Sequence, residues 1–209
     1  MWEFAGIDVA GMGIRDVQSR APVAEQAPLN RERIVAAALS LLDETGLEGL
    51  STRRLASDLG IKSASLYWHF KNKDELLDAM CSAMFNENMG MLKPHGPGFD
   101  WVKWLTDGAR RMRRTALSRR DGAQIMARVR PHGERSAERT RRNLELLANV
   151  GFDCDEGRYI LVTLRRYAIG CALQEQSDIA AGKIPTEGDG EASFEFGLDL
   201  IMDSLKRRV

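Results

Sequence analysis

The sequence predicts an all-α protein with a three-helix N-terminal head (residues 29–73) and a larger helical domain (residues 74–209). Apolar residues recur every three or four positions along most of the chain, which is the period of an amphipathic helix. No segment shows the alternation of apolar and polar residues that is typical of a strand. Glycines and prolines interrupt the periodic segments and set the expected helix ends. At 209 residues, the chain is long enough to bury a sizeable core.

The first helix is expected to begin after Asn30 and to stop at Gly46. Asn30 suits the N-cap position because its side-chain oxygen can accept a hydrogen bond from a free backbone N–H group. Ile34, Ala38 and the Leu41–Leu42 pair then fall on one face, which predicts an amphipathic helix packed against the rest of the head.

Residues 51–73 predict two short helices separated by Gly60. Leu55 and Leu59 form the apolar face of the first helix. Gly60 ends this helix because glycine tolerates the left-handed conformation of a helix C-terminus. The second helix is expected to start at a Ser63 cap.

The second short helix divides its apolar residues between two sides. Leu66 and Phe70 are four residues apart and are expected to point inward. Tyr67 and Trp68 then face outward, and two adjacent aromatics exposed to water imply a partner that covers them. This is the layout of a helix-turn-helix that reads DNA. Alternatively, Tyr67 and Trp68 are core aromatics that pack against the next helix.

Six further helices are expected in the larger domain. Asp74 lies in the first turn of the leading helix, where the helix dipole favours negative charge, and Asp100 suits the cap of the following one. The segments 93–99 and 182–190 are rich in glycine and proline and are expected to be linkers. The helices are expected at about residues 74–89, 100–118, 121–129, 134–149, 153–180 and 191–207.

The composition excludes several classes of protein. Lysine plus arginine balance aspartate plus glutamate at 30 each, so any binding of nucleic acid must rest on a local patch. The three cysteines lack CxxC spacing, which favours free thiols in a reducing cytoplasm over disulfides or a metal site. No stretch approaches the roughly 18 apolar residues of a membrane span, and the N-terminus lacks the basic region of a signal peptide.

The helix-turn-helix, in which Leu-Tyr-Trp-His is followed by Lys-Asn-Lys, closely resembles the DNA-binding head of TetR-type transcriptional regulators. By their chemistry, Arg53 can bind the edge of a guanine base, and Trp68 can make apolar contact with a sugar or a thymine methyl group. Hydrogen bonds to phosphates are expected from Tyr67, His69 and Lys73. The resemblance implies that the following residues contact DNA: Thr52, Arg53, Lys62, Ser63, Ala64, Ser65, Tyr67, Trp68, His69 and Lys73.

The first 28 residues show no clean period and contain several glycines and prolines, so we expect a disordered arm. Alternatively, Arg15 and Arg20 in this arm contact the minor groove or phosphates, as homeodomain arms do.

Residues 194–201 (Phe-Glu-Phe-Gly-Leu-Asp-Leu-Ile) resemble the C-terminal dimerisation helix of TetR proteins. The helices near 155–180 and 191–207 are therefore expected to form a four-helix bundle with those of a second copy. The small residues at 170–172 would permit close approach of helices. A two-fold dimer implies a palindromic DNA operator. Alternatively, these residues fill the core of a monomer.

The resemblance to tetracycline-binding members of the family extends through the larger domain, where Asp100-Trp101 and Arg120-Asp121-Gly122-Ala123 match. Met126 stands where those members have a metal-binding histidine, Met89 replaces a pocket histidine, and Gln174 replaces a glutamate. Methionine does not ligate a hard cation, so we expect no metal or cofactor and a largely apolar inducer other than magnesium–tetracycline. Alternatively, the methionines are core filler. The implied pocket residues are Met89, Gly108, Met112, Met126, Val129, Asn143 and Gln174.

An arginine-rich stretch has no counterpart in that resemblance. Twelve arginines lie between Arg110 and Arg142, accompanied by three acidic residues, whereas eleven acidic residues lie between Asp153 and Asp203. We expect a solvated face that pairs with the acidic helices. The alternatives are an anionic inducer or additional contact with flanking DNA.

These patterns predict a dimeric repressor that a small molecule releases from its operator. Alternatively, the protein is a DNA-binding regulator or activator without a small-molecule inducer. An enzyme is not expected, because the three histidines, His69, His95 and His132, are scattered and no nucleophile–base spacing or phosphate loop is present.

Overall fold

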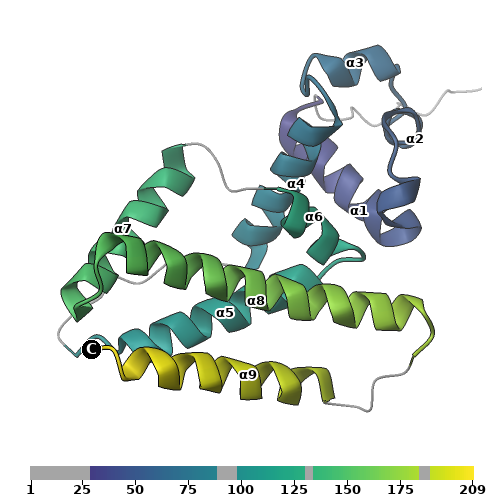
Figure 1. The fold of residues 1–209 in the computed structure, drawn as a ribbon. Coiled ribbons are helices and arrows are strands. Elements are labelled where there is room, and N and C mark those ends of the chain that lie inside the picture. Colours follow the sequence, from purple (N-terminus) through teal and green to yellow (C-terminus); the bar gives the residue numbers. More distant parts are fainter. Residues whose placement is uncertain (1–28, 89–97, 130–133, 184–188) are drawn as a thin grey trace, which may run out of the picture.

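The computed structural model describes residues 29–88, 98–129, 134–183 and 189–209, and these ranges contain nine α-helices and no strand (Figure 1). The predicted all-α class is confirmed. The predicted Met89 site lies outside the described residues, as does the predicted N-terminal arm. The helices are α1 (Arg31–Gly49), α2 (Thr52–Asp58), α3 (Ser63–Tyr67), α4 (Lys73–Asn88), α5 (Trp101–Leu117), α6 (Gly122–Arg128), α7 (Glu134–Val150), α8 (Cys154–Ala180) and α9 (Asp189–Lys206).

The predicted cap of α1 is present, and so is the predicted break at Gly46. Asn30 Oδ1 accepts a hydrogen bond from the backbone N–H of Arg33 at 2.8 Å. Gly46 has a φ of 71° and a non-helical backbone, so the regular helix that begins at Arg31 is interrupted there, and a further short helical segment runs to Gly49. The segment after Gly46 packs against the head, since Leu47 and Leu50 are buried there.

The core of the head continues into the larger domain. A single apolar cluster joins residues of α1 to α4 with residues of α6 and the middle of α8, and Met80 and Met84 of α4 lie fully buried within it. In Figure 1, α4 runs from the head down to α6 and the long helices of the body. The head is therefore fixed to the body by a shared core.

The body is organised around α5 and α8, which pack along one another, with α9 beside both and α7 against α8 (Figure 1). A second apolar cluster fills this region, and Phe194 of α9 stacks on Tyr167 of α8 with ring centroids 5.3 Å apart. Arg113 of α5 forms a largely buried ion pair with Glu175 of α8 at 2.7 Å. These contacts hold three helices from distant parts of the chain together.

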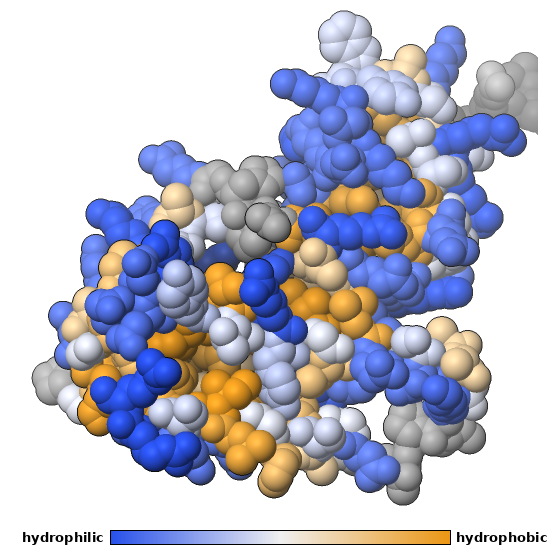
Figure 2. Space-filling view, in the orientation of Figure 1, coloured by the Kyte–Doolittle hydropathy of each residue, from blue (hydrophilic) through white to orange (hydrophobic). Residues whose placement is uncertain are grey.

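Not all of the apolar surface of the body is covered. Figure 2 shows apolar side chains reaching the surface over the long helices of the body, among charged ones. The large exposed apolar residues of α8 and α9 are Tyr159, Val162, Ile179, Phe196 and Leu200. No helix in the described part of the chain is long and apolar enough to cross a membrane.

Candidate DNA-binding surface and ligand cavity

The turn between α2 and α3 is closed by backbone hydrogen bonds around Gly60. Gly60 has a φ of 66°, and the N–H of Ile61 donates to the carbonyl of Ala56 at 2.9 Å, which is the bond of a glycine-terminated helix end. The expected Ser63 cap is wrong by one residue. Lys62 occupies the cap position in an extended conformation, makes no side-chain capping bond, and leaves Ser63 as the first helical residue.

Helix α3 and the residues directly after it bury one side and expose the other. Leu66 and Phe70 are buried, as predicted, whereas 57% of Tyr67 and 90% of Trp68 are exposed. The alternative that these two aromatics belong to the core is therefore wrong. Their exposure arises because α3 is a single short turn whose inward positions are already filled by Leu66 and Phe70.

The remaining predicted DNA-contact residues lie on α2, on α3 and the residues beside it, and at the start of α4. Arg53, Lys62, Ala64 and Lys73 are exposed. Thr52, Ser63, Ser65 and His69 are half-buried. Contact of each of these residues with DNA stays a prediction.

A polar network that the sequence reading missed fixes the end of α3 against α1 and α4. Arg31 donates to the carbonyl of His69, pairs with Glu75 at 2.9 Å, and lies over the ring of Phe70 at 4.1 Å from its centroid. Glu75 also accepts from the backbone N–H of Lys71 at 2.8 Å. This backbone hydrogen bond, followed by the Arg31 side-chain bond, lowers the pKa of Glu75.

Lys73 has a second role besides the predicted one. Its Nζ donates to the carbonyl of Leu50 at 2.7 Å and so ties the start of α4 to the link between α1 and α2. The ammonium group is held beside the helix-turn-helix by this bond.

A cavity of about 130 Å³ lies within the body, between α4, α5, α7 and α8. Three of the predicted pocket residues line it: Gly108 and Met112 of α5, and Asn143 of α7. Phe85 and Trp104 supply aromatic walls. The structure thus unites residues from four helices at one internal site.

The other predicted pocket residues in the described ranges lie elsewhere. Met126 and Val129 are buried in the core around α6 and do not line the cavity. Gln174 is exposed on α8, where its amide donates to Asp178 at 3.1 Å. A methionine-rich lining is therefore not found, since only Met112 of the described methionines reaches the cavity.

Three arginines also line the cavity: Arg111 of α5, Arg139 of α7 and Arg165 of α8. All three are half-buried. The sequence placed Arg111 and Arg139 in the arginine-rich stretch without distinguishing them from their neighbours. Among the described residues, no group of three or more histidine, cysteine, aspartate or glutamate side chains could hold a metal ion.

Within the described ranges, two residues of the arginine-rich stretch pair with the acidic helices as expected. Arg110 makes a two-pronged contact with Glu195 of α9, at 2.6 Å for the shorter bond, and Arg113 pairs with Glu175 of α8. Arg119 departs from this pattern, because it pairs with Asp43 of α1 and thereby joins the body to the head.

Helix α6 is held at both ends. At its C-terminal end, Arg165 donates to the carbonyls of Met126 and Val129 at 2.6 and 2.8 Å. At its N-terminal end, Asp121 accepts from the backbone N–H of Leu47 at 2.8 Å, immediately after the kink in α1. The side chain of Gln176 in α8 accepts from the backbone N–H of Ala123 at the start of α6 at 3.1 Å, and it donates to the carbonyls of Ala116 and Arg119, which precede α6, at 3.2 and 2.8 Å. Helix α6 therefore connects the wall of the cavity to the head.

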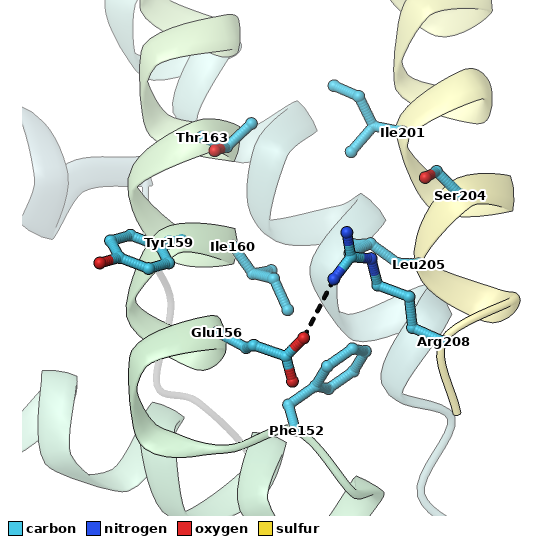
Figure 3. Close-up of a pocket in the computed structure, with 9 residues that line it drawn as sticks. All are labelled: Phe152, Glu156, Tyr159, Ile160, Thr163, Ile201, Ser204, Leu205 and Arg208. Carbon is cyan, nitrogen blue, oxygen red and sulfur yellow. Dashed lines mark hydrogen bonds and ion pairs between the residues drawn. The ribbon is translucent and has the colours of Figure 1, made fainter.

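A second hollow, of about 320 Å³, is open on the outer face between α8 and α9 (Figure 3). Phe152, Ile160 and Leu205 contribute apolar surface to it, and Glu156 and Arg208 form an ion pair across it at 3.0 Å. It lies on the pair of helices predicted to meet a second copy.

Comparison with known proteins assigns the chain to a family. The family described as bacterial regulatory proteins, tetR family, matches residues 34–80, and the tetracyclin repressor-like C-terminal domain matches residues 93–188. The class C tetracycline repressor of Escherichia coli is 36% identical over 202 residues, covering 86% of this chain and 91% of the relative. The chain belongs to the TetR family.

Solved TetR structures share the fold as well as the sequence. A TetR variant from Acinetobacter baumannii AYE in complex with minocycline has a TM-score of 0.79 and 36% identity, covering 86% of this chain and 98% of the other. The class A TetR in complex with 5a,6-anhydrotetracycline and magnesium has a TM-score of 0.74 and 39% identity, covering 86% and 99%. As a TetR-family member, the protein is a DNA-binding transcriptional repressor and not an enzyme.

Proposed function

We propose that this repressor acts as a homodimer on a palindromic operator and that a small ligand other than a magnesium–tetracycline chelate releases it. The 90% exposure of Trp68, the C-cap residue of α3, beside the exposed Tyr67, carries the DNA-binding part of this proposal. A partner must cover these aromatics, and the major groove of DNA fits a short helix that presents them.

The exposed apolar residues of α8 and α9 support a dimer. Tyr159 and Val162 of α8 and Phe196 and Leu200 of α9 remain exposed in the single chain, and the hollow in Figure 3 lies between the same helices. A second copy that packs there would cover these residues in a four-helix arrangement. Two-fold symmetry would then present two α3 helices to half-sites about 34 Å apart.

Magnesium does not fit the side chains that line the internal cavity. Magnesium prefers an octahedron of oxygen ligands, usually including carboxylates. The polar side chains from the described residues are Arg111, Arg139 and Arg165, which are cationic donors, and Asn143, which offers one oxygen. Arginines repel a divalent cation, so the ligand differs from the magnesium–drug pair bound by the class A relative.

The apolar part of the cavity suits an organic ligand with a hydrophobic body. Phe85, Trp104, Met112 and Leu161 line it in addition to the polar groups. Such a combination of apolar walls with a few polar anchors is typical of small-molecule sites.

The contacts of α6 provide a route from the cavity to the head. Arg165 contacts both the cavity and the last carbonyls of α6, and Asp121 at the other end of α6 holds the backbone of Leu47. A ligand that binds one arrangement of Arg165 better than another would shift α6 and, through Asp121, the position of the head. Coupling of this kind is typically worth about 1–3 kcal/mol.

The test begins with selection of the operator from random duplexes, followed by fluorescence anisotropy with the selected DNA. Compounds are then screened for two effects together, a raised melting temperature and release of the operator. A ligand at about 100 times its Kd would stabilise the protein by about 2.7 kcal/mol. If compounds stabilise the protein without releasing DNA, or if none stabilises it, a regulator without an inducer is the better description.

A further inference from the structure

We propose that the ligand of the internal cavity is an anion, specifically a carboxylate attached to an aromatic ring system, and that Arg111 and Arg139 bind its charge. This inference rests on the proposed function, because it assumes that the cavity is the inducer site. It specifies the chemical class of the inducer and differs from the expectation of a largely apolar molecule.

The charged side chains that line the cavity all carry a positive charge. Arg111, Arg139 and Arg165 line it, and no aspartate or glutamate does so in the described ranges. Arginine side chains are cationic, so three positive charges share one small cavity. Like charges in such surroundings repel one another more strongly than in water, and a bound anion would relieve this repulsion.

Arg111 and Arg139 differ from their neighbours in the arginine-rich stretch. Arg110, Arg113 and Arg119 each pair with a carboxylate at 2.6–2.7 Å. In contrast, neither Arg111 nor Arg139 makes an ion pair or hydrogen bond with any described residue, and Arg139 instead lies over Phe85 at 5.9 Å from the ring centroid.

The carboxylates closest to this pair along the chain are already engaged. Asp107, one turn before Arg111, bonds Lys103 at 2.8 Å, lies 3.8 Å from Arg110 and attracts Arg111 through its charge without forming an ion pair with it. Glu138, next to Arg139, bonds Arg142 at 2.6 Å. The guanidinium groups of Arg111 and Arg139 thus remain suited to two-pronged contact with a carboxylate from outside the chain.

The walls indicate what carries the carboxylate. Phe85 and Trp104 offer aromatic faces, and Leu161 and Leu164 complete an apolar side. The cavity volume of about 130 Å³ is close to the roughly 150 Å³ that holds a benzene molecule in an engineered apolar cavity. One ring fits the present space, and Asn143 can bond a further polar substituent.

Arg165 links binding of the anion to the position of α6. Its Nη2 atom donates to both terminal carbonyls of α6, at 2.6 and 2.8 Å. A carboxylate in the cavity would compete with these carbonyls for the same guanidinium group. Binding of the anion would therefore loosen the C-terminal end of α6.

The experiment measures binding of benzoate, 2-naphthoate and anthracene-2-carboxylate to the full chain by calorimetry, with the neutral carboxamide of each as its matched partner. We expect the best carboxylate to bind at least about 10-fold more tightly than its carboxamide. Arg139→Gln and Arg111→Gln should each weaken carboxylate binding about 10- to 100-fold and leave the carboxamide nearly unchanged.

The matched control is Arg142→Gln, three residues after Arg139 on the same helix but exposed and paired with Glu138. It should change neither affinity. Arg139→Lys keeps the charge without the planar fork and should fall between the wild type and Arg139→Gln. Retained carboxamide binding shows that each variant is folded.

The inference is overturned if the carboxamides bind as well as the carboxylates, if no carboxylate binds at about 1 mM, or if Arg142→Gln is as harmful as Arg139→Gln. The operator assay separates this failure from failure of the proposed function. Carboxylate binding that depends on Arg139 but leaves operator affinity unchanged would support the anion site and refute ligand-released repression. Operator release by a neutral compound alone would refute the anion site and support ligand-released repression.

Discussion

Replacement of Asp121 tests how the body is attached to the head. Asp121 has a φ of 54°, and its Oδ2 accepts from the N–H of Leu47 at 2.8 Å, while Oδ1 accepts from Gln124 at 3.1 Å. Loss of a hydrogen bond to a charged group costs about 1.5–3 kcal/mol. Alanine in the left-handed region adds about 1 kcal/mol. Asp121→Ala should therefore lower the free energy of unfolding by about 2.5–4 kcal/mol.

Two further substitutions separate these contributions. Asp121→Gly removes the carboxylate but tolerates the backbone conformation, so its cost should be smaller than that of alanine. Asp121→Asn keeps an acceptor and also tolerates the left-handed conformation, so the loss should be within about 1 kcal/mol. The expected order of destabilisation is asparagine, glycine, alanine, with alanine the most harmful.

The assay is urea unfolding at one fixed protein concentration, because dimerisation would make the midpoint depend on concentration. Asp58→Ala is the control, since Asp58 is exposed at the end of α2 and should change stability by no more than about 0.5 kcal/mol. An alanine variant no less stable than this control would refute the role assigned to Asp121. A glycine variant less stable than the alanine variant would refute the contribution of backbone conformation.

Four further outcomes are expected. Arg53→Ala should cost about 1–3 kcal/mol in operator binding and relax specificity at one base pair, measured with operator variants; a uniform loss on all sequences would make Arg53 a phosphate contact. Trp68→Ala should weaken operator binding by about 2 kcal/mol yet leave the melting temperature nearly unchanged, because the side chain is 90% exposed; unchanged affinity would remove Trp68 from the interface. Glu75 has a folded pKa below its usual value of 4.5, so its stabilising effect is complete at neutral pH and is lost as the pH falls through the folded pKa. The stability deficit of Glu75→Gln in urea should accordingly shrink on acidification, and a deficit that stays constant from pH 7 to about pH 3 would contradict this. Leu200→Glu, at an exposed position of α9, should shift the protein toward monomer in sedimentation experiments, whereas an unchanged dimer would place the interface elsewhere.

The features that the sequence predicted correctly depend on near neighbours in the chain. The cap at Asn30, the turn at Gly60 and the inward position of Leu66 and Phe70 follow from helical period and side-chain chemistry within a few residues. The sequence did not predict the short helical segment after Gly46, where the backbone N–H of Leu47 is held by Asp121, 74 residues away.

The arginines that line the cavity could not be predicted from the sequence for a similar reason. Arg110 and Arg113 pair with residues 85 and 62 positions away, whereas Arg111 and Arg139 face the cavity. All four belong to one arginine-rich stretch and look alike in sequence. Only the packing of α5 against α8 and α9 determines which of them meets a carboxylate.

The apolar cluster that runs from α1 through α4 to α6 limits where the chain can be divided to build chimeric repressors. A chimera cut between residues 73 and 74 would leave Leu76, Leu77 and Met80 facing a foreign surface. An interchangeable reading head would have to include α4 and keep complementary side chains at the α5–α6 turn, where Asp43 and Leu47 make their contacts. New operator preferences are therefore better introduced by substitutions on α2 and α3 than by exchange of the whole head.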